Sequence, residues 1–447
     1  MIKKNVLNIV LIFVLIFTLT SCDKKDDKIY GGYFEVPIII SNDSNYYISG
    51  YSGGRYYTDI LDYQKAKAFY LKYYGEEVLM ISIDCVGLTS GYVNEIRDAL
   101  NFNFPVNIVS THTHAGVDTM GLWGPVGIDG KNEKFMKDLV DAAVKAGKEA
   151  YKNAIEGKLT YGYIETNDIL RDSREPLVYD KNIYQLRFIS KEDNIGTRLV
   201  FYGAHAESLG GSNTKISADF PHIMAKVIKE KTNDNMIYFP GAIGGLICTN
   251  TFDETDVENN MKITGEKLSE YVLKIKEEDI SSGSLKQTTV NFKIRLDNTI
   301  FLYYKFLGIL KNNIVKSLFK NTYYVKTELS VIQIDQITIV LIPGEIFPEL
   351  VWGGTIDNPD LANSKDNPDS LIDIANKYNI ENLIIVGLVN DEIGYIIPPS
   401  DFLVHKEYPY VLSIEDSKGE NHYEETMSVG ETGAIKIAEA FEKVLKK

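Results

Sequence analysis

Residues 106–116, with the sequence VNIVSTHTHAG, combine a short apolar run with two histidines and a glycine. The run Val106–Ser110 predicts a strand, because a short apolar run bounded by turn signals is typical of one in a buried sheet. Alternate side chains of an extended chain share a face, so His112 and His114 can point at one place. Such a pair at a strand end, followed by small residues and Gly116, commonly presents imidazole to a metal. The segment therefore predicts a β-sheet with functional side chains at a strand end.

The rest of the chain alternates apolar strand-like runs with amphipathic helix-like runs, which predicts an α/β fold. The further expected strands are Val78–Ile83, Lys158–Ile164, Tyr184–Ile189, Arg198–Ala204, Met236–Phe239, Thr289–Ile294, Leu329–Ile334, Ile337–Ile342 and Asn382–Gly387. The expected helices are Asn132–Asn153, Phe220–Lys231, Val257–Glu277, Ser370–Lys377 and Thr432–Lys446. No linker separates two halves, so we expect one large domain over residues 30–447, with mixed β-sheets flanked by helices.

The N-terminus predicts an export signal. Lys3 and Lys4 precede an unbroken apolar run, Ile9–Phe17, which is too short to span a bilayer with ease. The run closes with the sequence LTSC at residues 19–22, which resembles the bacterial lipoprotein box. We therefore expect a lipoprotein signal peptide over residues 1–21.

In a lipoprotein box the cysteine is acylated and becomes the new N-terminus, so we expect lipidation at Cys22. Residues 22–29 then form a charged tether. This predicts a protein exported to the cell envelope and lipid-anchored to a membrane, on its periplasmic or extracellular face. The alternative is a cleaved signal with an incidental cysteine.

The composition excludes some classes of function. The chain has 447 residues and a net charge of −15, so no nucleic-acid partner is expected, because phosphate binding needs a basic face. Only Cys85 and Cys248 follow Cys22. An exported chain with two further cysteines is not a disulfide scaffold, so its stability must come from its core.

Three further polar segments follow predicted strands. They contain His205, Glu345 and, in the sequence GLVNDEIGY at residues 387–395, a tyrosine at Tyr395. A carboxylate at a strand end suits a metal ligand or a general base. The structural alternatives are a satisfied core histidine at His205 and the first turn of a helix at Glu345.

Residues 297–323 form a basic amphipathic pattern inside an acidic protein. Apolar side chains such as Phe301 and Leu310 are interleaved with lysines from Lys305 to Lys320. Basic amphipathic helices can lie in a membrane interface. A core helix with a solvated lysine face explains the same pattern, and both interpretations stay open.

Taken in order, these segments resemble the neutral/alkaline ceramidase family. That family has a Thr-His-Thr-His-like segment with small residues after it, a strand ending in a His, a Gly-Glu after a strand, and a Gly-Leu-x-Asn segment leading to a Tyr. The matching segments, with the family's Tyr-Glu segment and a strand-end Asp, are residues 111–114, His205, residues 344–345, residues 387–395, Tyr423-Glu424 and Asp84.

The resemblance implies a ceramidase-like catalytic domain with one zinc held by His112, His205, Glu345 and Tyr395. His114 would stand beside the metal as a proton-transfer group. The implied activity is zinc-dependent hydrolysis of the N-acyl amide bond of a lipid amide, ceramide or something like it, by metal-bound water. Family members usually continue past the catalytic domain, whereas this chain stops there. We therefore expect no C-terminal Ig-like domain.

One loop departs from the family. Ceramidases carry an Asn-Cys-Gly-Asp-Val-Ser-Pro-Asn-like stretch whose Ser has been given a nucleophile role, and the matching residues 240–250 read PGAIGGLICTN. Leu246 replaces the Asp, and Cys248 falls where the Ser would be. Cys248 is therefore a candidate catalytic nucleophile. A buried inert thiol is the other interpretation, because nothing nearby in sequence would lower its pKa.

Two alternative functions stay open. One is a hydrolase of the same fold that acts on another amide or ester. The other is a lipoprotein that binds a lipid or glycan without catalysis, which the altered loop at residues 240–250 motivates. The four candidate ligands favour an enzyme, because a binding module has no need of them.

Overall fold

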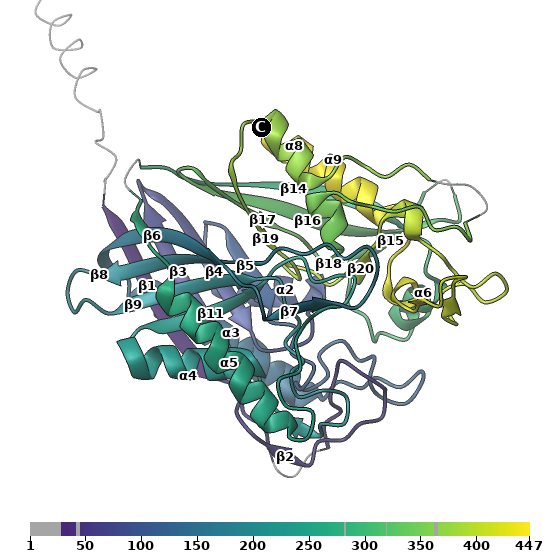
Figure 1. Cartoon of the computed structure of the whole chain (residues 1–447), viewed down its shortest axis with the longest axis horizontal. Helices are drawn as coiled ribbons and strands as arrows, with labels where there is room; N and C mark the ends of the chain where they lie inside the picture. The colour runs from purple at the N-terminus through teal and green to yellow at the C-terminus, as the bar shows by residue number, and fades with distance from the viewer. Residues whose placement is uncertain (1–27, 42–44, 281–282, 319, 362–364) are drawn as a thin grey trace, which may run out of the picture.

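The computed structural model describes residues 28–41, 45–280, 283–318, 320–361 and 365–447 (Figure 1). The expected signal peptide over residues 1–21 and the acylation site Cys22 lie outside these residues and stay predictions, as do the domain boundaries. Within the described part of the chain, no helix is both long enough and apolar enough to cross a membrane.

The larger of two main sheets has nine strands. They are β1 (Ile29–Pro37), β3 (Lys65–Tyr73), β4 (Glu76–Ile83), β5 (Val106–Ser110), β6 (Ile155–Glu165), β8 (Asn182–Ser190), β9 (Gly196–Tyr202), β11 (Asn235–Pro240) and β13 (Glu278–Asp279). Their order is β11-β9-β8-β6-β1-β3-β4-β5, with β13 paired to β6. Only the pairs β4-β5 and β9-β11 are parallel among these strands, so the sheet is mixed, as expected.

The smaller sheet has the order β14-β16-β17-β19, with β15 paired to β16. Its strands are β14 (Leu285–Leu296), β15 (Ile314–Lys316), β16 (Tyr323–Ile334), β17 (Ile337–Leu341) and β19 (Asn382–Val386). Short two-stranded pairs join loops elsewhere: β2 (Asp59–Ile60) with β10 (Lys215–Ile216), β7 (Leu170–Asp172) with β12 (Ile247–Thr249), β18 (Glu345–Ile346) with β20 (Tyr395–Ile396), and β21 (Ile414–Glu415) with β22 (Asn421–His422).

Helices cover the outer faces of both sheets (Figure 1). The helices are α2 (Ser90–Leu100), α3 (Glu133–Lys152), α4 (Phe220–Thr232), α5 (Val257–Lys274), α6 (Thr299–Phe306), α7 (Pro348–Trp352), α8 (Leu371–Lys377) and α9 (Gly433–Leu445). Helices α2 to α5 share buried apolar clusters with the nine-stranded sheet, and α8 and α9 share one with the five-stranded sheet.

The two sheets pack face to face through a third apolar core. Phe201 and Phe239 of the larger sheet belong to one buried cluster with Ile384 and Val386 of β19. The alternate β19 residues, such as Ile385, belong to the cluster that contains α8 and α9. This period of two is the side-chain alternation of a strand with both faces buried. The architecture is therefore helices, sheet, sheet and helices, in four layers.

The strands and helices expected from the sequence are present, with small shifts at their ends. The largest shift is at the expected strand Leu329–Ile334, which begins at Tyr323, and the expected strand Thr289–Ile294 begins at Leu285. Strands β1 and β3 and helix α2 were not anticipated. Both strands depart from the alternation of apolar and polar residues that indicates a strand. Strand β1 contains two adjacent glycines, and β3 is buried on both faces.

The basic stretch 297–323 does not form one amphipathic helix, so both helical interpretations were wrong. Asn298 caps α6 by accepting hydrogen bonds from two backbone N–H groups, and Gly308, at a φ of +77°, follows the end of the helix. The chain then becomes extended and forms β15. Phe301 is buried, whereas Phe306 is 69% exposed.

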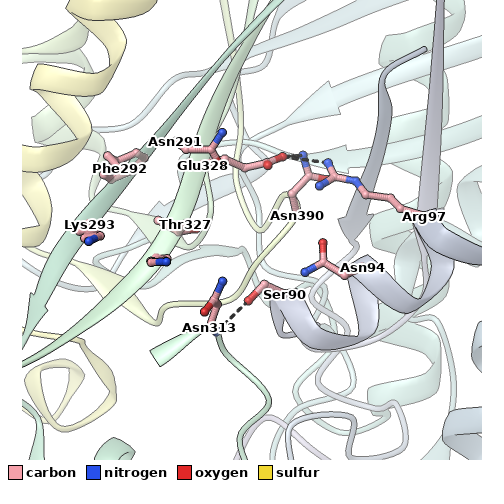
Figure 2. Close-up of a pocket in the computed structure, with 11 residues that line it drawn as sticks. Ser90, Asn94, Arg97, Asn291, Phe292, Lys293, Asn313, Thr327, Glu328 and Asn390 are labelled. Carbon is pink, nitrogen blue, oxygen red and sulfur yellow. Dashed lines mark hydrogen bonds and ion pairs between the residues drawn. The ribbon is translucent and has the colours of Figure 1, made fainter. Parts of the chain in front are cut away.

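Asn390 joins the loop after β19 to the edge strand β5. Its side-chain oxygen accepts the N–H of Ile108 at 2.8 Å, and its own N–H donates to the Ile108 carbonyl at 2.8 Å. Its Nδ2 donates to Glu328 of β16 at 2.9 Å, and Glu328 also pairs with Arg97 at 2.8 Å (Figure 2). Asn390 therefore links strand β5 of the larger sheet to strand β16 of the smaller sheet.

We expect Asn390→Ala to lower the free energy of unfolding by about 2 kcal/mol, because it leaves the buried Ile108 N–H without its partner. Asn390 also has a φ of 65°, which an alanine adopts less readily. Urea denaturation checks this. Asn94→Ala is the matched control, because Asn94 is exposed and lines the same surface pocket as Asn390 (Figure 2). This substitution should change the stability by less than about 0.5 kcal/mol. Equal effects of the two substitutions would contradict the role given to Asn390.

Candidate metal centre

Four loops meet where strands of the two sheets end. They follow β5, β9, β17 and β19, and they carry His112, His205, Glu345 and Tyr395. A parallel bridge between Thr113 and Ala206 holds the first two loops together. The register of β18 and β20 places Glu345 opposite Tyr395. Strand ends that converge in this way bring together side chains that are distant in sequence.

Two imidazole rings and one carboxylate converge on one buried position. The Nε2 atoms of His112 and His205 each lie 3.3 Å from Oε2 of Glu345. Nδ1 of His112 lies 2.6 Å from the Val86 carbonyl, and Nδ1 of His205 lies 2.9 Å from the Ile247 carbonyl. Because a carbonyl only accepts, both Nδ1 atoms carry the proton and both Nε2 lone pairs face Glu345.

This arrangement fits a metal ion better than a set of hydrogen bonds. The buried Nε2 of His112 has no hydrogen-bond partner among the described residues, and an unpaired buried polar atom is costly. Histidine ligands typically donate their second N–H to a carbonyl or carboxylate, as both do here.

Two tyrosines lie beside these three groups. The hydroxyl oxygens of Tyr395 and Tyr423 are 3.4 Å apart, and both residues line the cavity that His112 and Glu345 also line. Burial, followed by the charge of Glu345, raises the pKa of Tyr395 well above its ordinary value. In this structure the Tyr395 hydroxyl is therefore protonated and can donate a hydrogen bond.

His114 is held by a carboxylate that the sequence analysis did not identify. Its Nδ1 lies 3.2 Å from Oε2 of Glu207, and the same oxygen accepts the hydroxyl of Tyr51 at 2.9 Å. Glu207 is two residues after His205, so the alternation used for His112 and His114 could have indicated it. Tyr51 is in a loop far away in sequence, and no sequence signal marked it.

A cavity of about 460 Å³ opens onto the site. Besides His112, His114, Glu345 and the two tyrosines, its lining is largely apolar and includes Val86, Met120, Leu122, Trp123, Phe301 and Leu310. Cavities of this size that are apolar except for a few converging polar groups are typical of small-molecule sites. The site therefore has room for an apolar ligand next to the proposed metal ligands.

Two residues named by the sequence analysis, Cys248 and Asp84, do not belong to the lining of this cavity. The Cys248 thiol is buried, lies 3.2 Å from the Leu246 carbonyl, and has its pKa raised by burial and then by Glu207. Asp84 accepts the Lys65 N–H at 3.0 Å and lies 3.8 Å from the Lys67 ammonium, which ties β3 to β4. Asp84 is therefore a structural contact of the larger sheet.

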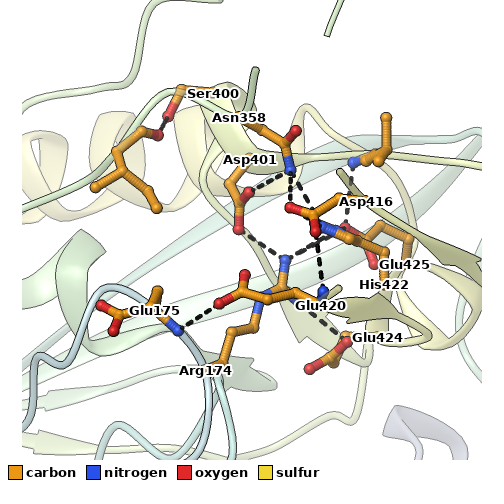
Figure 3. Close-up of polar contacts among 12 residues, drawn as sticks. Arg174, Glu175, Asn358, Ser400, Asp401, Asp416, Glu420, His422, Glu424 and Glu425 are labelled. Atoms are coloured by element: carbon orange, nitrogen blue, oxygen red, sulfur yellow. Dashed lines mark hydrogen bonds and ion pairs between the residues drawn. The ribbon is translucent and has the colours of Figure 1, made fainter. Parts of the chain in front are cut away.

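A network of buried charges supports the segment that carries Tyr423 (Figure 3). Arg174 contacts Asp401 at 2.7 Å and Glu424 at 2.9 Å. His422 and Glu424 flank Tyr423 in sequence, and His422 is 1% exposed. The network therefore fixes the backbone on both sides of the tyrosine.

A separate group of possible ligands, Asp416, Glu420 and His422, lies in this network. Its atoms already have partners. His422 Nε2 accepts from Asn358 at 3.1 Å, and Glu420 accepts the Glu175 N–H at 3.2 Å. It therefore lacks the unpaired nitrogen that distinguishes the site at His112.

Comparison with known proteins points to one family, although no family model matches the chain. The neutral ceramidases of Drosophila melanogaster and Drosophila pseudoobscura pseudoobscura are each 24% identical, over 219 and 221 residues. Each match covers 44% of this chain and 30% of the relative. The matched region thus spans less than a third of the length of these curated relatives.

Two solved structures share the fold. The neutral ceramidase from Pseudomonas aeruginosa has a TM-score of 0.71 at 13% identity, and the alignment covers 94% of this chain and 74% of that one. A ceramidase complexed with C2 has a TM-score of 0.70 at 13% identity, with coverage of 94% and 75%. The fold is that of the neutral ceramidases, and the resemblance expected from the sequence is confirmed.

We expect purified protein to bind about one zinc ion per chain. Because His205 and Glu345 point at the same buried position, His205→Ala and Glu345→Ala should each lower the metal content several-fold. Elemental analysis after dialysis checks this. His222→Ala removes a histidine outside the site, paired with Asp62 at 3.6 Å, and should leave the metal content unchanged. Equal metal content in all four proteins would contradict the assignment of the ligands.

Proposed function

We propose that this protein is a zinc-dependent amidohydrolase that cleaves the N-acyl bond of a lipid amide, ceramide or a close analogue. The observation that carries the proposal is the unpaired His112 Nε2 beside Glu345 at one end of a largely apolar cavity. The similarity to neutral ceramidases supports the same reaction class.

The residues proposed to hold zinc are His112, His205, Glu345 and Tyr395. Neutral imidazoles and a carboxylate are ligands that zinc prefers. When bound, zinc would supply a Lewis acid that polarises an amide carbonyl and lowers the pKa of a water molecule.

His114 is suited to move a proton at the reacting amide. Burial lowers its pKa to about 4, and the nearby Glu207 opposes this effect only in part, so the ring is neutral at pH 7. The Glu207 carboxylate 3.2 Å from Nδ1 favours the tautomer that carries its proton on that atom. Nε2 is then free to accept a proton and deliver it to the leaving amine.

The apolar lining supports a lipid substrate. Met120, Trp123, Phe301 and Leu310 surround the space next to the histidines. Each methylene group that leaves water in such a cavity stabilises the complex by about 0.8 kcal/mol. The walls would also keep bulk water away from the reacting groups, which strengthens the electrostatic interactions there.

We further propose that the protein works at a membrane surface. Trp123 and Phe301, which line the cavity, continue outward into an apolar rim formed by Val126, Ile128, Tyr303, Phe306 and Leu307. Val126 is 95% exposed, and a side chain built on Gly127 would come within 3.7 Å of the Tyr303 hydroxyl. The loop at residues 126–128 and α6 therefore form one apolar surface, of the kind that marks contact with a membrane or a partner.

The lipid anchor proposed at Cys22 would complement this rim. Lys316 lies over the ring of Tyr323, which packs against Phe306, and Lys305 belongs to α6. In a protein with a net charge of −15, a local group of lysines favours the anionic headgroups of a bilayer. The anchor would keep the enzyme at the membrane, and the rim would orient its cavity.

A panel of fluorogenic N-acyl amides and esters tests the proposed activity. We expect hydrolysis of long-chain N-acyl amides, loss of activity with a zinc chelator, and recovery on adding zinc. Esters hydrolysed in preference to amides would favour the alternative hydrolase. Lipid binding without turnover of any substrate would favour the non-catalytic lipoprotein.

The same panel separates two nucleophiles. Cys248→Ala should retain most of the activity, because the thiol is buried and its pKa is raised. Complete loss of activity in a variant with unchanged circular dichroism and metal content would instead support a thiol nucleophile.

We expect Val126→Ser together with Phe306→Ser to lower turnover of vesicle-borne substrate about 10-fold, because burial of both side chains in the bilayer is lost. Turnover of a water-soluble short-chain analogue should not change. Leu177→Ser, a 61% exposed leucine outside the rim, is the matched control and should alter neither rate. Equal losses on vesicles and on the soluble analogue would show that the rim does not act at the membrane.

A further inference from the structure

A second cavity, of about 360 Å³, lies between helix α4 and the strands β1, β3 and β11. None of the candidate metal ligands lines it, and the proposed function gives it no role. Its lining carries four lysines and three carboxylates, which are Lys65, Lys67, Lys226, Lys229, Glu35, Asp84 and Asp234. The character of the cavity therefore depends on which of these charges already have partners.

Two of the three carboxylates already have cationic partners. Glu35 accepts a hydrogen bond from Nζ of Lys65 at 2.6 Å. Asp234 contacts Nε of Arg198 at 2.7 Å. Neither carboxylate is therefore left to balance the charge of a further lysine at the cavity.

The ammonium group of Lys67 is buried and forms no hydrogen bond with the described residues. Lys67 is 3% exposed, and the register of β1 and β3 sets it opposite Glu35, whose carboxylate binds Lys65 instead. The only carboxylate oxygen of the described residues within 4 Å of Nζ is Oδ2 of Asp84, at 3.8 Å. That distance is too long for a hydrogen bond. Three N–H donors of a buried cation thus remain unused at the cavity, which is costly.

The carboxyl group of Asp84 offers a second unused atom at the same cavity. Its Oδ2 accepts the Lys65 N–H, whereas the buried Oδ1 has no hydrogen-bond partner among the described residues. Burial raises the pKa of Asp84, and the charge of Lys67 offsets this effect only in part. A carboxyl group held toward its neutral form balances the Lys67 charge incompletely. Positive charge therefore remains to be balanced from outside the chain.

Helix α4 brings two more donors to the other side of the cavity. Lys226 is exposed and has no ion pair with any described residue. His222 is four residues earlier, so it shares a helix face with Lys226. Burial, followed by the charge of Lys67, lowers the pKa of His222 to about 4, although Asp62 lies 3.6 Å from its Nδ1. The imidazole is therefore neutral at pH 7 and carries one N–H donor.

We infer that this cavity binds the phosphate group of a small phosphate monoester, between Lys67 on β3 and the pair His222 and Lys226 on α4. A phosphate monoester carries nearly two negative charges at pH 7, which matches the two lysines without a hydrogen-bonded partner. Its three terminal oxygens can accept from donors on both sides of the cavity. A neutral Asp84 can donate a further hydrogen bond to the same group, and the cavity volume leaves room for a small organic group.

Calorimetry with glycerol 3-phosphate tests the site in the full chain. We expect saturable binding at one site per chain, weaker binding of inorganic phosphate, and none of glycerol. Lactate, a singly charged carboxylate of similar size, should bind at least about 10-fold more weakly, because it offers less charge and fewer oxygens. Lactate binding as tightly as glycerol 3-phosphate would contradict the assignment to phosphate, and absence of any binding would overturn the site.

Three lysine variants separate a built site from diffuse attraction. Lys67→Met and Lys226→Met should each weaken the binding of glycerol 3-phosphate by about 10- to 100-fold, because each removes a charged hydrogen-bond donor. Lys229→Met is the matched control, since Nζ of Lys229 already donates to the Asn233 carbonyl at 2.8 Å and to Asn235 at 3.1 Å. It should change the Kd by less than about 2-fold. Because Lys226 is exposed, its variant keeps the test valid even if Lys67→Met does not fold. Equal effects of Lys226→Met and Lys229→Met would overturn the proposal.

The pKa of His222, measured by NMR, separates this cavity from the metal centre, where a phosphate can also bind zinc. A dianion beside the imidazole favours its charged form, so glycerol 3-phosphate should raise the pKa of His222 from about 4 by about one unit or more. His222→Gln identifies the signal. Binding should also persist in His205→Ala, which lacks a proposed metal ligand. Binding without a change in the pKa of His222, or loss of binding in His205→Ala, would place the phosphate elsewhere and overturn the inference.

Discussion

A buried carboxylate 3.3 Å from two imidazole nitrogens is the constraint on which this structure depends. The unpaired Nε2 atom of His112 is buried away from water, so it destabilises the folded protein unless a cation binds there. The geometry holds because the opposite ring nitrogens are fixed by backbone carbonyls of Val86 and Ile247. The site is thus built into the main chain of the surrounding loops, which ties its geometry to the fold.

The four-layer architecture supplies those loops. Two of the proposed ligands come from strand ends of the nine-stranded sheet and two from strand ends of the five-stranded sheet. The apolar core between the sheets sets their separation. Asn390 fastens the edge of one sheet to the other, and the charges around Arg174 hold the Tyr423 segment. Rigid supports of this kind keep catalytic groups in place.

The cavity and the apolar surface around it would together admit the proposed lipid amide. The apolar rim near α6 continues inward through Trp123 and Phe301 to the histidines. Affinity for such a substrate would then come mainly from the apolar area of the cavity.

The sequence by itself determined the strands with continuous apolar runs, the main helices and the residues at strand ends. His112, His114, His205 and Glu345 were all identified this way, because local hydrophobic periodicity fixes where a strand ends. Periodicity did not reveal β1 and β3. It also wrongly predicted one helix over residues 297–323, where Gly308, at a positive φ, follows the end of α6 and the chain then becomes extended. These failures have one cause, since a local pattern does not contain the partner strand or the loop that packs against it.

Only the tertiary structure decided which polar groups meet. It brought Glu207 and Tyr51 to His114 and opened the apolar cavity beside the histidines. It also placed Cys248 outside the cavity lining, where its position in sequence had left two roles open. Pairing, burial and the resulting pKa shifts depend on neighbours from distant parts of the chain, and the packing of the two sheets alone sets those neighbours.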